Sequence, residues 1–245
     1  MKKLIIVQAR MTSTRLPGKV MEVVCGKPLL EHIIDRLKRV KYADRIVIAT
    51  TVNETDDIIV ELCEKLDISY YRGSEEDVLG RYYETAVEYG GDIIIRITSD
   101  CPVIDPDVVD SLINFYIKNI KLYDYVSNTM KRTYPMGMDV EVFSFRLLNE
   151  AYANAYDPFD REHVTPFIKM RPQQFRLYNI LYWTDMSRYR WTLDTPEDLE
   201  LISKIFDALF YQNPSFSLKD MLDQMERTPE WETINAHVET KKYGQ

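Results

Sequence analysis

The stretch LIIVQARMTSTRLPGK, from Leu4 to Lys19, decides the fold. A short apolar run typical of a buried strand ends at Val7, and a polar loop follows it directly. The same order, a short apolar run and then a longer segment with helical spacing, recurs along the first half of the chain. The predicted strands there are Leu4–Val7, Arg45–Ala49, Ser69–Tyr71 and Asp92–Ile97. This alternation predicts an α/β fold with a mainly parallel sheet and crossover helices.

The second half of the chain has a less regular pattern. Its predicted strands are Tyr123–Ser127, Asp139–Phe145, Phe175–Leu181 and Tyr189–Leu193, and its predicted helices are Arg146–Ala155, Glu162–Met170 and 196–209. Thr195-Pro196-Glu197-Asp198 is a helix start, with Thr195 as the N-cap and proline in the first helical position. We expect one domain over residues 1–245 that ends in a polar helical extension, about 215–245, with few apolar anchors.

The composition of the 245 residues is that of an ordinary globular chain, with 45% hydrophobic and 29% charged residues. The 31 basic and 39 acidic side chains give a formal charge of −8, which disfavours a polymeric nucleic acid as a partner. No apolar run approaches the roughly 20 residues of a membrane span. Three cysteines without a CxxC pair cannot all form disulfides within the chain. We therefore expect a cytoplasmic protein that does not enter a membrane.

The loop after the first strand carries three cations, Arg10, Arg15 and Lys19, together with three hydroxyl groups and a glycine. In an open α/β sheet, ligands bind at the carboxyl ends of the strands, which is where this loop must lie. Cationic side chains and close backbone approach suit a polyphosphate. The loop is not a P-loop, because G-x-x-x-x-G-K-[ST] is absent. A solvated basic turn is the structural alternative.

Two aspartates follow predicted strands in the same manner, Asp100 in Thr98-Ser99-Asp100-Cys101-Pro102 and Asp194 before Thr195. Mg²⁺ needs only one or two carboxylates when substrate phosphates supply further oxygens. Taken singly, each aspartate is equally well explained as a turn residue that bonds to its own backbone. Two carboxylates and a cationic loop at three strand ends form a more specific set, and they predict a site for a metal and a nucleoside triphosphate.

The chain resembles the sugar cytidylyltransferases, such as the 3-deoxy-manno-octulosonate and acylneuraminate enzymes, in three motifs. These are R-x-x-x-T-R-L-P-G-K from Arg10, T-S-D-C-P from Thr98 and L-D-T-P-E-D-L from Leu193. The resemblance runs from about Lys3 to about Leu201 and is closest to the spore coat polysaccharide biosynthesis branch. It implies a Rossmann-like three-layer nucleotidyltransferase fold and a homodimer, with a small acceptor and dimerisation subregion at about 130–185.

The resemblance also implies an activity, the Mg²⁺-dependent transfer of CMP from CTP to a sugar, expected to be an acidic one, with release of pyrophosphate. Surface or spore coat polysaccharide biosynthesis is the expected setting. The implied catalytic residues are Arg15, Lys19 and Asp100, and the implied Mg²⁺ ligands are Asp100 and Asp194. The implied contacts to CTP are Ala9, Arg10, Arg15, Lys19, Arg72, Ser74, Asp77, Arg81 and Ser99. An i,i+4 ion pair on a helix is the structural alternative for Asp77 and Arg81.

Two segments are candidates for the acceptor sugar. In Gly137-Met138-Asp139-Val140-Glu141-Val142 the carboxylates Asp139 and Glu141 alternate with apolar residues, which predicts that they share one face of a strand. That face would meet the sugar, or it would be the solvated face of an edge strand. Asp160-Arg161-Glu162-His163 is similar to the spore coat branch motif near the acceptor. The predicted sugar contacts are Gly137, Asp139, Glu141, Arg161, Glu162 and His163.

Two other functions remain as alternatives. Asp105-Pro106-Asp107 matches the D-x-D string of glycosyltransferases that use a nucleotide sugar, but proline at a helix start favours Asp105 as an N-cap. A non-catalytic nucleotide-binding subunit would keep the fold without the chemistry. Such a subunit gains nothing from carboxylates that face a cationic loop.

Overall fold

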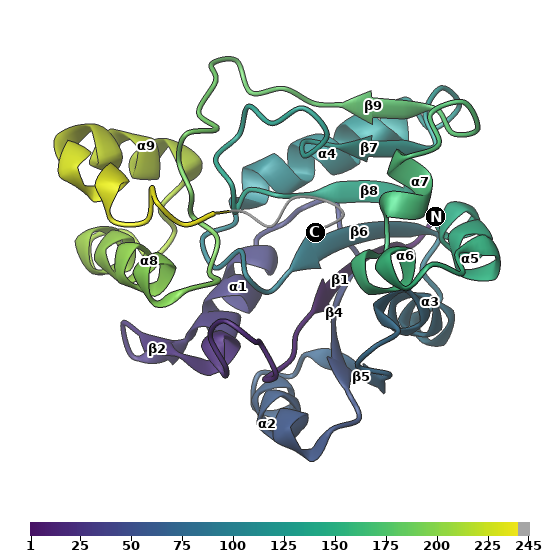
Figure 1. Cartoon of the computed structure of the whole chain (residues 1–245), viewed down its shortest axis with the longest axis horizontal. Coiled ribbons are helices and arrows are strands. Elements are labelled where there is room, and N and C mark those ends of the chain that lie inside the picture. The colour runs from purple at the N-terminus through teal and green to yellow at the C-terminus, as the bar shows by residue number, and fades with distance from the viewer. Residues whose placement is uncertain (240–245) are drawn as a thin grey trace.

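The computed structural model describes residues 1–239, and a seven-stranded sheet runs through its centre (Figure 1). Its first half is built from four strand–helix units, as the alternation predicted. The strands are β1 (Lys3–Gln8), β4 (Arg45–Thr51), β5 (Ser69–Gly73) and β6 (Ile93–Thr98), and the helices are α1 (Leu29–Leu37), α2 (Asp57–Lys65), α3 (Val78–Tyr89) and α4 (Pro106–Lys118). These four strands pair in parallel. A small hairpin of β2 (Val23–Val24) and β3 (Lys27–Pro28) precedes α1.

The second half completes the sheet with an antiparallel strand and two short strands. β8 (Glu141–Ser144) pairs antiparallel with β6 and with β7 (Tyr125–Ser127), and β9 (Leu177–Asn179) pairs parallel with β7. The strand order is therefore β5-β4-β1-β6-β8-β7-β9. The helices of this half are α5 (Phe145–Asn154), α6 (Pro158–His163), α7 (Pro166–Lys169), α8 (Pro196–Leu209) and α9 (Leu218–Arg227), with the short 3₁₀ segment Pro229–Thr233 after α9.

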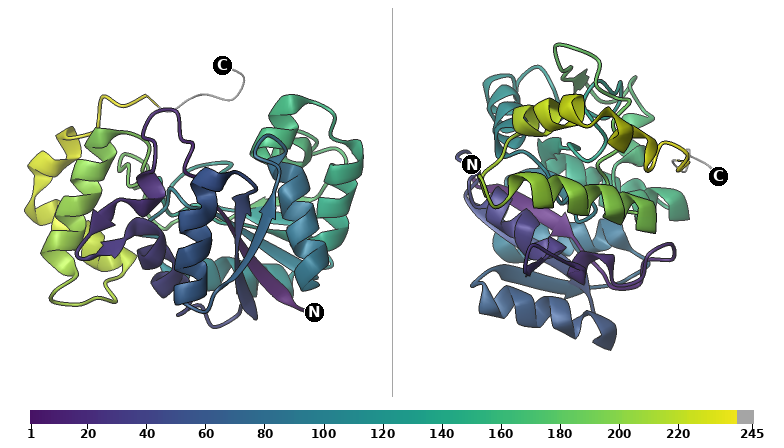
Figure 2. Two further views of the ribbon diagram at one scale, coloured as in Figure 1. Left: turned by 90° about the horizontal axis from the view of Figure 1, so that it is seen from below. Right: turned by 90° about the vertical axis from the view of Figure 1, so that its left-hand side faces the viewer.

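The two faces of the sheet are covered by different helices, which makes three layers (Figure 2). Ile5 and Val7 of β1 pack against the layer that contains α1, α2, α4, α8 and α9. Leu4 and Ile6 point to the other face and pack against α3, α5 and α7. Because side chains alternate along a strand, a continuous apolar run such as that of β1 serves both layers, which is why it was recognisable as a buried parallel strand.

Two expectations for the second half are wrong. Tyr189–Leu193 does not form a strand, and its pairing consists of an isolated bridge between Arg190 and Met136. The expected helix over Glu162–Met170 is divided into α6 and α7 at Val164, which has a positive φ of 71°. Pro166 contributes to this break, because proline has no N–H to continue the α-helical ladder.

The predicted helix start at Thr195 is confirmed. The hydroxyl of Thr195 accepts from the N–H of Asp198, and the carboxylate of Asp198 accepts from the N–H of Thr195, which is a complete capping box. Asp105 is likewise the N-cap of α4, since its side chain accepts from the N–H of Asp107 at 2.8 Å. This structural role accounts for the D-x-D string.

The segment after α8 is helical but better anchored than its polar sequence indicated. Leu218, Met221, Leu222 and Met225 of α9 are buried in the same core as α8. The part of the expected extension over 240–245 lies outside the described residues. Within residues 1–239, no helix combines the length and the apolar character that crossing a bilayer requires.

Candidate active site

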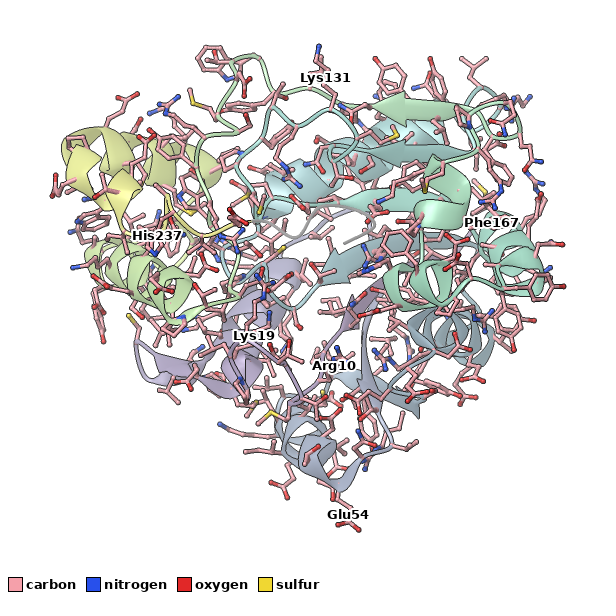
Figure 3. The ribbon with its side chains drawn as sticks, in the orientation of Figure 1. Arg10, Lys19, Glu54, Lys131, Phe167 and His237 are labelled. Carbon is pink, nitrogen blue, oxygen red and sulfur yellow. The ribbon has the colours of Figure 1, made fainter. Side chains whose placement is uncertain are left out.

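A cavity of about 310 Å³ opens at the carboxyl ends of β1 and β6. The chain passes from β1 to β4 and β5 on one side and then returns to place β6 on the other side of β1, so the strand order reverses at this point. Ligands of open α/β sheets bind at such a reversal. The cavity is lined by these predicted site residues: Ala9, Arg10, Arg15, Lys19, Arg81, Ser99, Asp100, Glu162, His163 and Asp194. Figure 3 shows Arg10 and Lys19 near the middle of the molecule.

The cationic loop is held at its start by two carboxylates. Arg10 Nη1 lies 3.1 Å from Glu75 Oε1, and the hydroxyl of Thr12 donates to the same oxygen. The N–H of Met11 donates to Asp56 Oδ1 at 2.8 Å. Hydrogen bonds from Thr12 in particular lower the pKa of Glu75, so the carboxylate stays ionised beside Arg10. The loop is therefore an ordered element of the site rather than a solvated turn.

Asp194 is the centre of a cationic cluster. Lys19 Nζ lies 2.9 Å and Arg15 Nη2 3.0 Å from Asp194 Oδ1, while Arg190 Nη2 lies 3.1 Å from Oδ2. Burial by itself raises the pKa of Asp194, but the charges of Lys19, Arg15 and Arg190 outweigh it and lower that pKa below its usual range. The carboxylate is ionised and brings the cationic loop and the start of α8 together.

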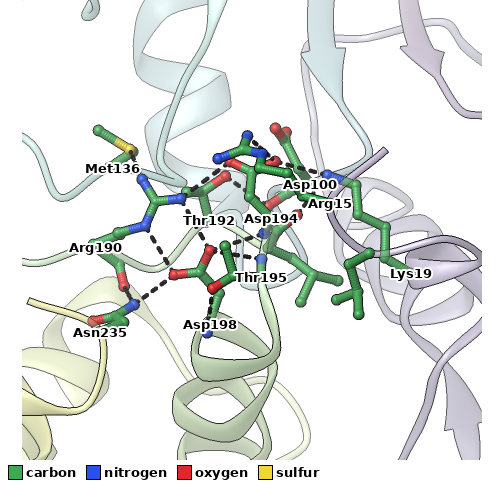
Figure 4. Close-up of polar contacts among 12 residues, drawn as sticks. Arg15, Lys19, Asp100, Met136, Arg190, Thr192, Asp194, Thr195, Asp198 and Asn235 are labelled. Carbon is green, nitrogen blue, oxygen red and sulfur yellow. Dashed lines mark hydrogen bonds and ion pairs between the residues drawn. The ribbon is translucent and has the colours of Figure 1, made fainter. Parts of the chain in front are cut away.

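The ion pair between Arg190 and Asp198 lies beside Asp194 and supports it (Figure 4). Arg190 donates to both oxygens of Asp198, from Nε at 2.8 Å and from Nη2 at 2.9 Å, and Asp198 is fully buried. Asp198 Oδ2 also accepts from the N–H of Asp194 at 2.9 Å. Asn235 Nδ2 donates to the carbonyl of Arg190 and to Asp198 Oδ1. This network positions Asp194, and Arg190 belongs to the segment Tyr189–Leu193 that the sequence pattern predicted as a strand.

The backbone at position 137, which packs against Trp191 just before Asp194, requires glycine. Its φ is 102°, and a Cβ atom at this position would lie 2.4 Å from the carbonyl oxygen of Trp191. Residues with a side chain rarely adopt this φ and could not approach the backbone so closely. Gly137 therefore packs against the segment that leads to Asp194, and it lies outside the lining of the cavity.

Asp100 reaches the cavity from the end of β6. Its carbonyl accepts from the N–H of Leu193 at 2.8 Å, which brings Asp100 and Asp194 to the same edge. Asp100 Oδ1 accepts from the hydroxyl of Thr98 and from the thiol of Cys101. Burial, with the charge of Asp100, raises the pKa of Cys101 well above its usual value, so that thiol stays protonated. Asp100 Oδ2 accepts no hydrogen bond within residues 1–239.

The donor set at this edge fits Mg²⁺. Asp100 and Asp194 provide hard carboxylate oxygens on one cavity, as Mg²⁺ prefers. Across the described residues, no cluster of three or more His, Cys, Asp or Glu side chains is arranged to hold a metal. Further ligands would have to come from a substrate and from water. The phosphates of a bound triphosphate would compete with Asp194 for Lys19 and Arg15, and Asp194 would then no longer be paired with these two cations.

Three of the predicted CTP contacts have structural partners outside the cavity. Arg72 donates to Asp57 Oδ1 at 2.6 Å and to the carbonyls of Thr51 and Asn53. Ser74 accepts from the N–H of Asp77 at 3.1 Å. The carboxylate of Asp77 caps α3 and pairs with Arg161, so the helical partner considered for it, Arg81, is replaced by a residue of α6.

Of the residues predicted to contact the acceptor sugar, some line the cavity and others have structural partners outside it. Glu162 and His163 line the cavity. Asp139 forms a two-point ion pair with Arg132, at 2.5 and 2.8 Å. Glu141 is buried, where its oxygens lie 2.5 Å from Arg96 Nη1 and 2.5 Å from the hydroxyl of Tyr125.

Arg96 and Gln8 are cavity residues that the sequence interpretation did not include. Arg96 Nη2 donates to Gln8 Oε1 at 3.0 Å, so the two side chains form a polar floor between β1 and β6. An arginine within the apolar run Ile93–Thr98 was the available signal, because a charge in a central strand requires a partner or a ligand.

The comparisons with known proteins agree with this geometry. The family profile described as cytidylyltransferase matches residues 4–227. The spore coat polysaccharide biosynthesis protein SpsF of Bacillus subtilis is 34% identical over 235 residues, which cover 93% of this chain and 95% of SpsF. A cytidylyltransferase structure from Leptospira borgpetersenii has a TM-score of 0.92 at 32% identity and covers 99% of this chain and 100% of that chain.

A more distant structure, that of CMP:2-keto-3-deoxy-manno-octonic acid synthetase complexed with CTP, has a TM-score of 0.65 at 17% identity. It covers 85% of this chain and 99% of that chain, and it shows a common fold. The fold and the cavity thus define a nucleotidyltransferase of the Rossmann-like, three-layer type. Within that class, the chain belongs to the cytidylyltransferase family, as its three motifs predicted.

Proposed function

We propose that this chain transfers the cytidylyl group of CTP to a hydroxyl of an acidic sugar. The sugar oxygen forms a bond to the α-phosphorus, the bond from that phosphorus to the bridging oxygen of the β-phosphate breaks, and pyrophosphate leaves. The hydroxyl proton is lost to solvent or to a neighbouring base. The products are a CMP-sugar and pyrophosphate, and surface or spore coat polysaccharide biosynthesis is the proposed setting.

One observation carries the proposal: Asp100, Asp194 and the cations Arg15 and Lys19 share one cavity at the reversal of strand order. In phosphoryl transfer, most of the catalysis comes from positioning and from stabilisation of charge. Lys19 and Arg15 would hold the leaving pyrophosphate. Ala9, Arg10, Arg81 and Ser99 line the same cavity and are the proposed further contacts to the nucleotide.

Asp100 and Asp194 are the proposed ligands of Mg²⁺. When bound, the metal supplies neutralisation of phosphate charge and a template for the two substrates. Thr98 and Cys101 donate to Asp100 Oδ1 and thereby orient the carboxylate. Arg190 and Asp198 hold Asp194 in place.

An acidic acceptor is favoured by the charges around the cavity. Five cationic side chains and three carboxylates line it, which leaves an excess of positive charge for anionic substrates. Glu162 and His163 from α6 are the proposed contacts to the sugar hydroxyls. Arg161, Asp139, Glu141 and Gly137 would then support the acceptor side indirectly, through their contacts with Asp77, Arg132, Arg96 and Trp191.

The test is a pyrophosphate-release assay with the full chain, CTP and Mg²⁺, and a panel of acidic and neutral sugars. We expect release with an acidic sugar and with CTP in preference to UTP, ATP and GTP. Dialysis against EDTA should abolish the release, and added Mg²⁺ should restore it. Mass spectrometry of the product should show one CMP per sugar.

Two results would contradict the proposal. Release of a nucleoside diphosphate from a nucleotide sugar, without pyrophosphate, would indicate a glycosyltransferase. Binding of CTP in calorimetry, without turnover of any sugar of the panel, would indicate a non-catalytic nucleotide-binding subunit.

A homodimer in the cytoplasm is the proposed state of the enzyme. The subregion at about 130–185 exposes large apolar side chains, among them Tyr156, which is 85% exposed, and Trp183, which is 82% exposed. Burial of such side chains is a common driving force for association. Light scattering on the purified chain tests this, since a monomer at micromolar concentration would contradict it.

A further inference from the structure

Gln8, the last residue of β1, lines the catalytic cavity together with Arg96 of the neighbouring strand β6. Both side chains lie on the sheet face that carries Ile6 and Ile94, because side chains alternate along a strand. This is the face that α3 covers. Neither Gln8 nor Arg96 belongs to the proposed contacts to phosphate, metal or sugar, so the task of this pair of side chains is open.

Arg96 is held in place by a buried carboxylate. Its Nη1 lies 2.5 Å from Glu141 Oε1, and the other oxygen of Glu141 accepts from the hydroxyl of Tyr125 at 2.5 Å. Lys169 Nζ lies 3.8 Å from the same Glu141 Oε2. Only 12% of the Arg96 side chain is exposed. The guanidinium group is therefore fixed in position and direction at the floor of the cavity.

Arg96 decides which end of the Gln8 amide faces the cavity. Arg96 Nη2 donates to Gln8 Oε1 at 3.0 Å. A guanidinium group carries only donors, so the reversed amide, with Nε2 towards Arg96, would set two donors against each other. Gln8 Nε2 has no hydrogen-bond partner among residues 1–239 and is reached by solvent. Gln8 therefore presents a donor to a ligand in the cavity.

The part of the cavity wall that α3 contributes suits a nucleobase. Val78 and Arg81 line it, and Arg81 is held by a hydrogen bond from Nη1 to the carbonyl of Ser74 at 2.6 Å. An apolar side chain and a fixed guanidinium group form a surface on which a flat aromatic ring stacks. A sugar has hydroxyl groups around its ring and needs more hydrogen-bonding partners than this wall provides. The proposed phosphate contacts lie elsewhere, on the loop after β1.

We propose that Gln8 selects cytosine over uracil by donating from Nε2 to the ring nitrogen N3 of the base, an inference that rests on the proposed use of CTP. N3 of cytosine is an acceptor, whereas N3 of uracil carries a hydrogen and is a donor. A donor of fixed direction gains a hydrogen bond from CTP and meets a second donor in UTP. A site rejects an analogue that leaves its polar groups unpaired. Arg96 is a positioning residue here, because it acts through Gln8.

Isothermal titration calorimetry of the full chain with CTP and with UTP, in the presence of Mg²⁺ and without sugar, tests the proposal. We expect the wild type to bind CTP at least about ten-fold more tightly than UTP, because UTP leaves a donor unpaired. In Gln8→Glu, one carboxylate oxygen still accepts from Arg96 and the other presents an acceptor to the base, so UTP should now bind more tightly than CTP. Gln173→Glu makes the same charge change at an exposed position outside the cavity lining and should leave the ratio of the two affinities unchanged.

Two further variants separate the donor from its orientation. Gln8→Met removes the donor without adding a charge, so CTP should bind more weakly and the ratio of affinities should approach one. Arg96→Gln/Glu141→Gln tests the positioning role, and the paired replacement avoids a buried charge without its partner. Because an amide at position 96 can donate or accept, the Gln8 amide is free to reverse, and the preference for CTP should fall although Gln8 is unchanged.

The proposal is overturned if the wild type binds CTP and UTP equally, or if Gln8→Glu and Gln173→Glu have the same ratio of affinities. An unchanged ratio with a higher KM for the sugar in Gln8→Glu would place Gln8 at the acceptor instead. A preserved preference in Arg96→Gln/Glu141→Gln would refute the positioning role of Arg96. The proposed function fails separately: selection of CTP through Gln8, without pyrophosphate release from any sugar, would contradict cytidylyl transfer but not the selection of the base.

Discussion

Lys19 Nζ lies 2.9 Å from Asp194 Oδ1, although 175 residues separate the two along the chain. Lys19 also donates to the carbonyl of Leu193 at 2.5 Å, so a side chain of the first loop is bound to the segment that opens α8. Only the tertiary fold creates this contact. A substrate phosphate that attracts Lys19 therefore also acts on Asp194.

Lys19→Ala should reduce kcat/KM for CTP by about 10-fold to 100-fold. A charge-assisted hydrogen bond contributes about 1.5–3 kcal/mol, and about 1.4 kcal/mol corresponds to a factor of ten. Steady-state kinetics of pyrophosphate release provides the measurement. Lys204→Ala on α8 is a matched control, because the side chain of that lysine is 42% exposed and pairs only weakly, at 3.8 Å, with Glu200. Equal values of kcat/KM for Lys19→Ala and Lys204→Ala would show that Lys19 does not contact the substrate.

Asp100→Asn should lower kcat by at least about 100-fold, since a metal-binding carboxylate supplies several kcal/mol of charge stabilisation. The melting temperature should change little, because the side chain accepts only from Thr98 and Cys101. Asp107→Asn is the control, as Asp107 is exposed on the first turn of α4. Full activity of Asp100→Asn would refute the metal assignment, and inactivity of Asp107→Asn would revive the D-x-D alternative.

Glu141 should make the free energy of unfolding depend on pH in the acid range. Burial by itself raises the pKa of Glu141, but the charges of Lys169 and Arg96 lower it to about 2. The unfolded chain binds this proton near pH 4.5. The contribution of Glu141 to stability is therefore complete above about pH 4.5 and is lost as the pH falls towards 2. It amounts to roughly 3 kcal/mol.

Glu141→Gln provides the measurement for this pH dependence. The variant should be less stable than the wild type at pH 7 in urea unfolding, because Arg96 loses its charged partner. The difference in unfolding free energy should shrink between pH 4.5 and pH 2. Glu150→Gln is the control, as the side chain of this glutamate on α5 is 41% exposed and forms only a weak ion pair, at 3.5 Å, with Arg146. A difference that stays constant over that range would contradict the depressed pKa.

Local signals account for what the sequence predicted well. The apolar runs of β1, β4 and β6 identify buried parallel strands without knowledge of their neighbours. Thr195 and Asp198 identify a helix start because both partners of the capping box lie within one turn. The convergence of Asp100 and Asp194 was inferred from a shared place at strand ends, although Asp194 does not in fact follow a strand.

Distant partners account for what the sequence did not predict. The alternation in Tyr189–Leu193 is typical of a strand, but Arg190 turns to Asp198 and Asp194 instead of extending a ladder. The alternation of Asp139 and Glu141 was interpreted as a face open to sugar or solvent. α7 covers part of that face, where Lys169 lies 3.8 Å from Glu141. No local pattern specifies which segment will cover a strand.

Asp198→Asn should destabilise the protein and reduce its activity together. Asp198 is fully buried and accepts from two nitrogens of Arg190 and from the N–H groups of Asp194 and Thr195. Removal of one partner from a buried ion pair costs about 3–5 kcal/mol. Because the same carboxylate holds the backbone of Asp194, kcat should fall even at temperatures where the variant is folded.

Asn235→Ala tests the neutral hydrogen bonds of this network separately from its ion pair. Asn235 is buried and donates to Asp198 Oδ1 at 2.8 Å and to the carbonyl of Arg190 at 2.9 Å, so its loss removes two hydrogen bonds but no charge. We expect it to cost about 1–3 kcal/mol in urea unfolding, since each net bond contributes about 0.5–1.5 kcal/mol. The ion pair of Arg190 and Asp198 remains, so kcat should stay within a few-fold of the wild type. If Asn235→Ala matched Asp198→Asn in both stability and kcat, the position of Asp194 would depend on packing of the carboxyl-terminal segment and not on the buried charge.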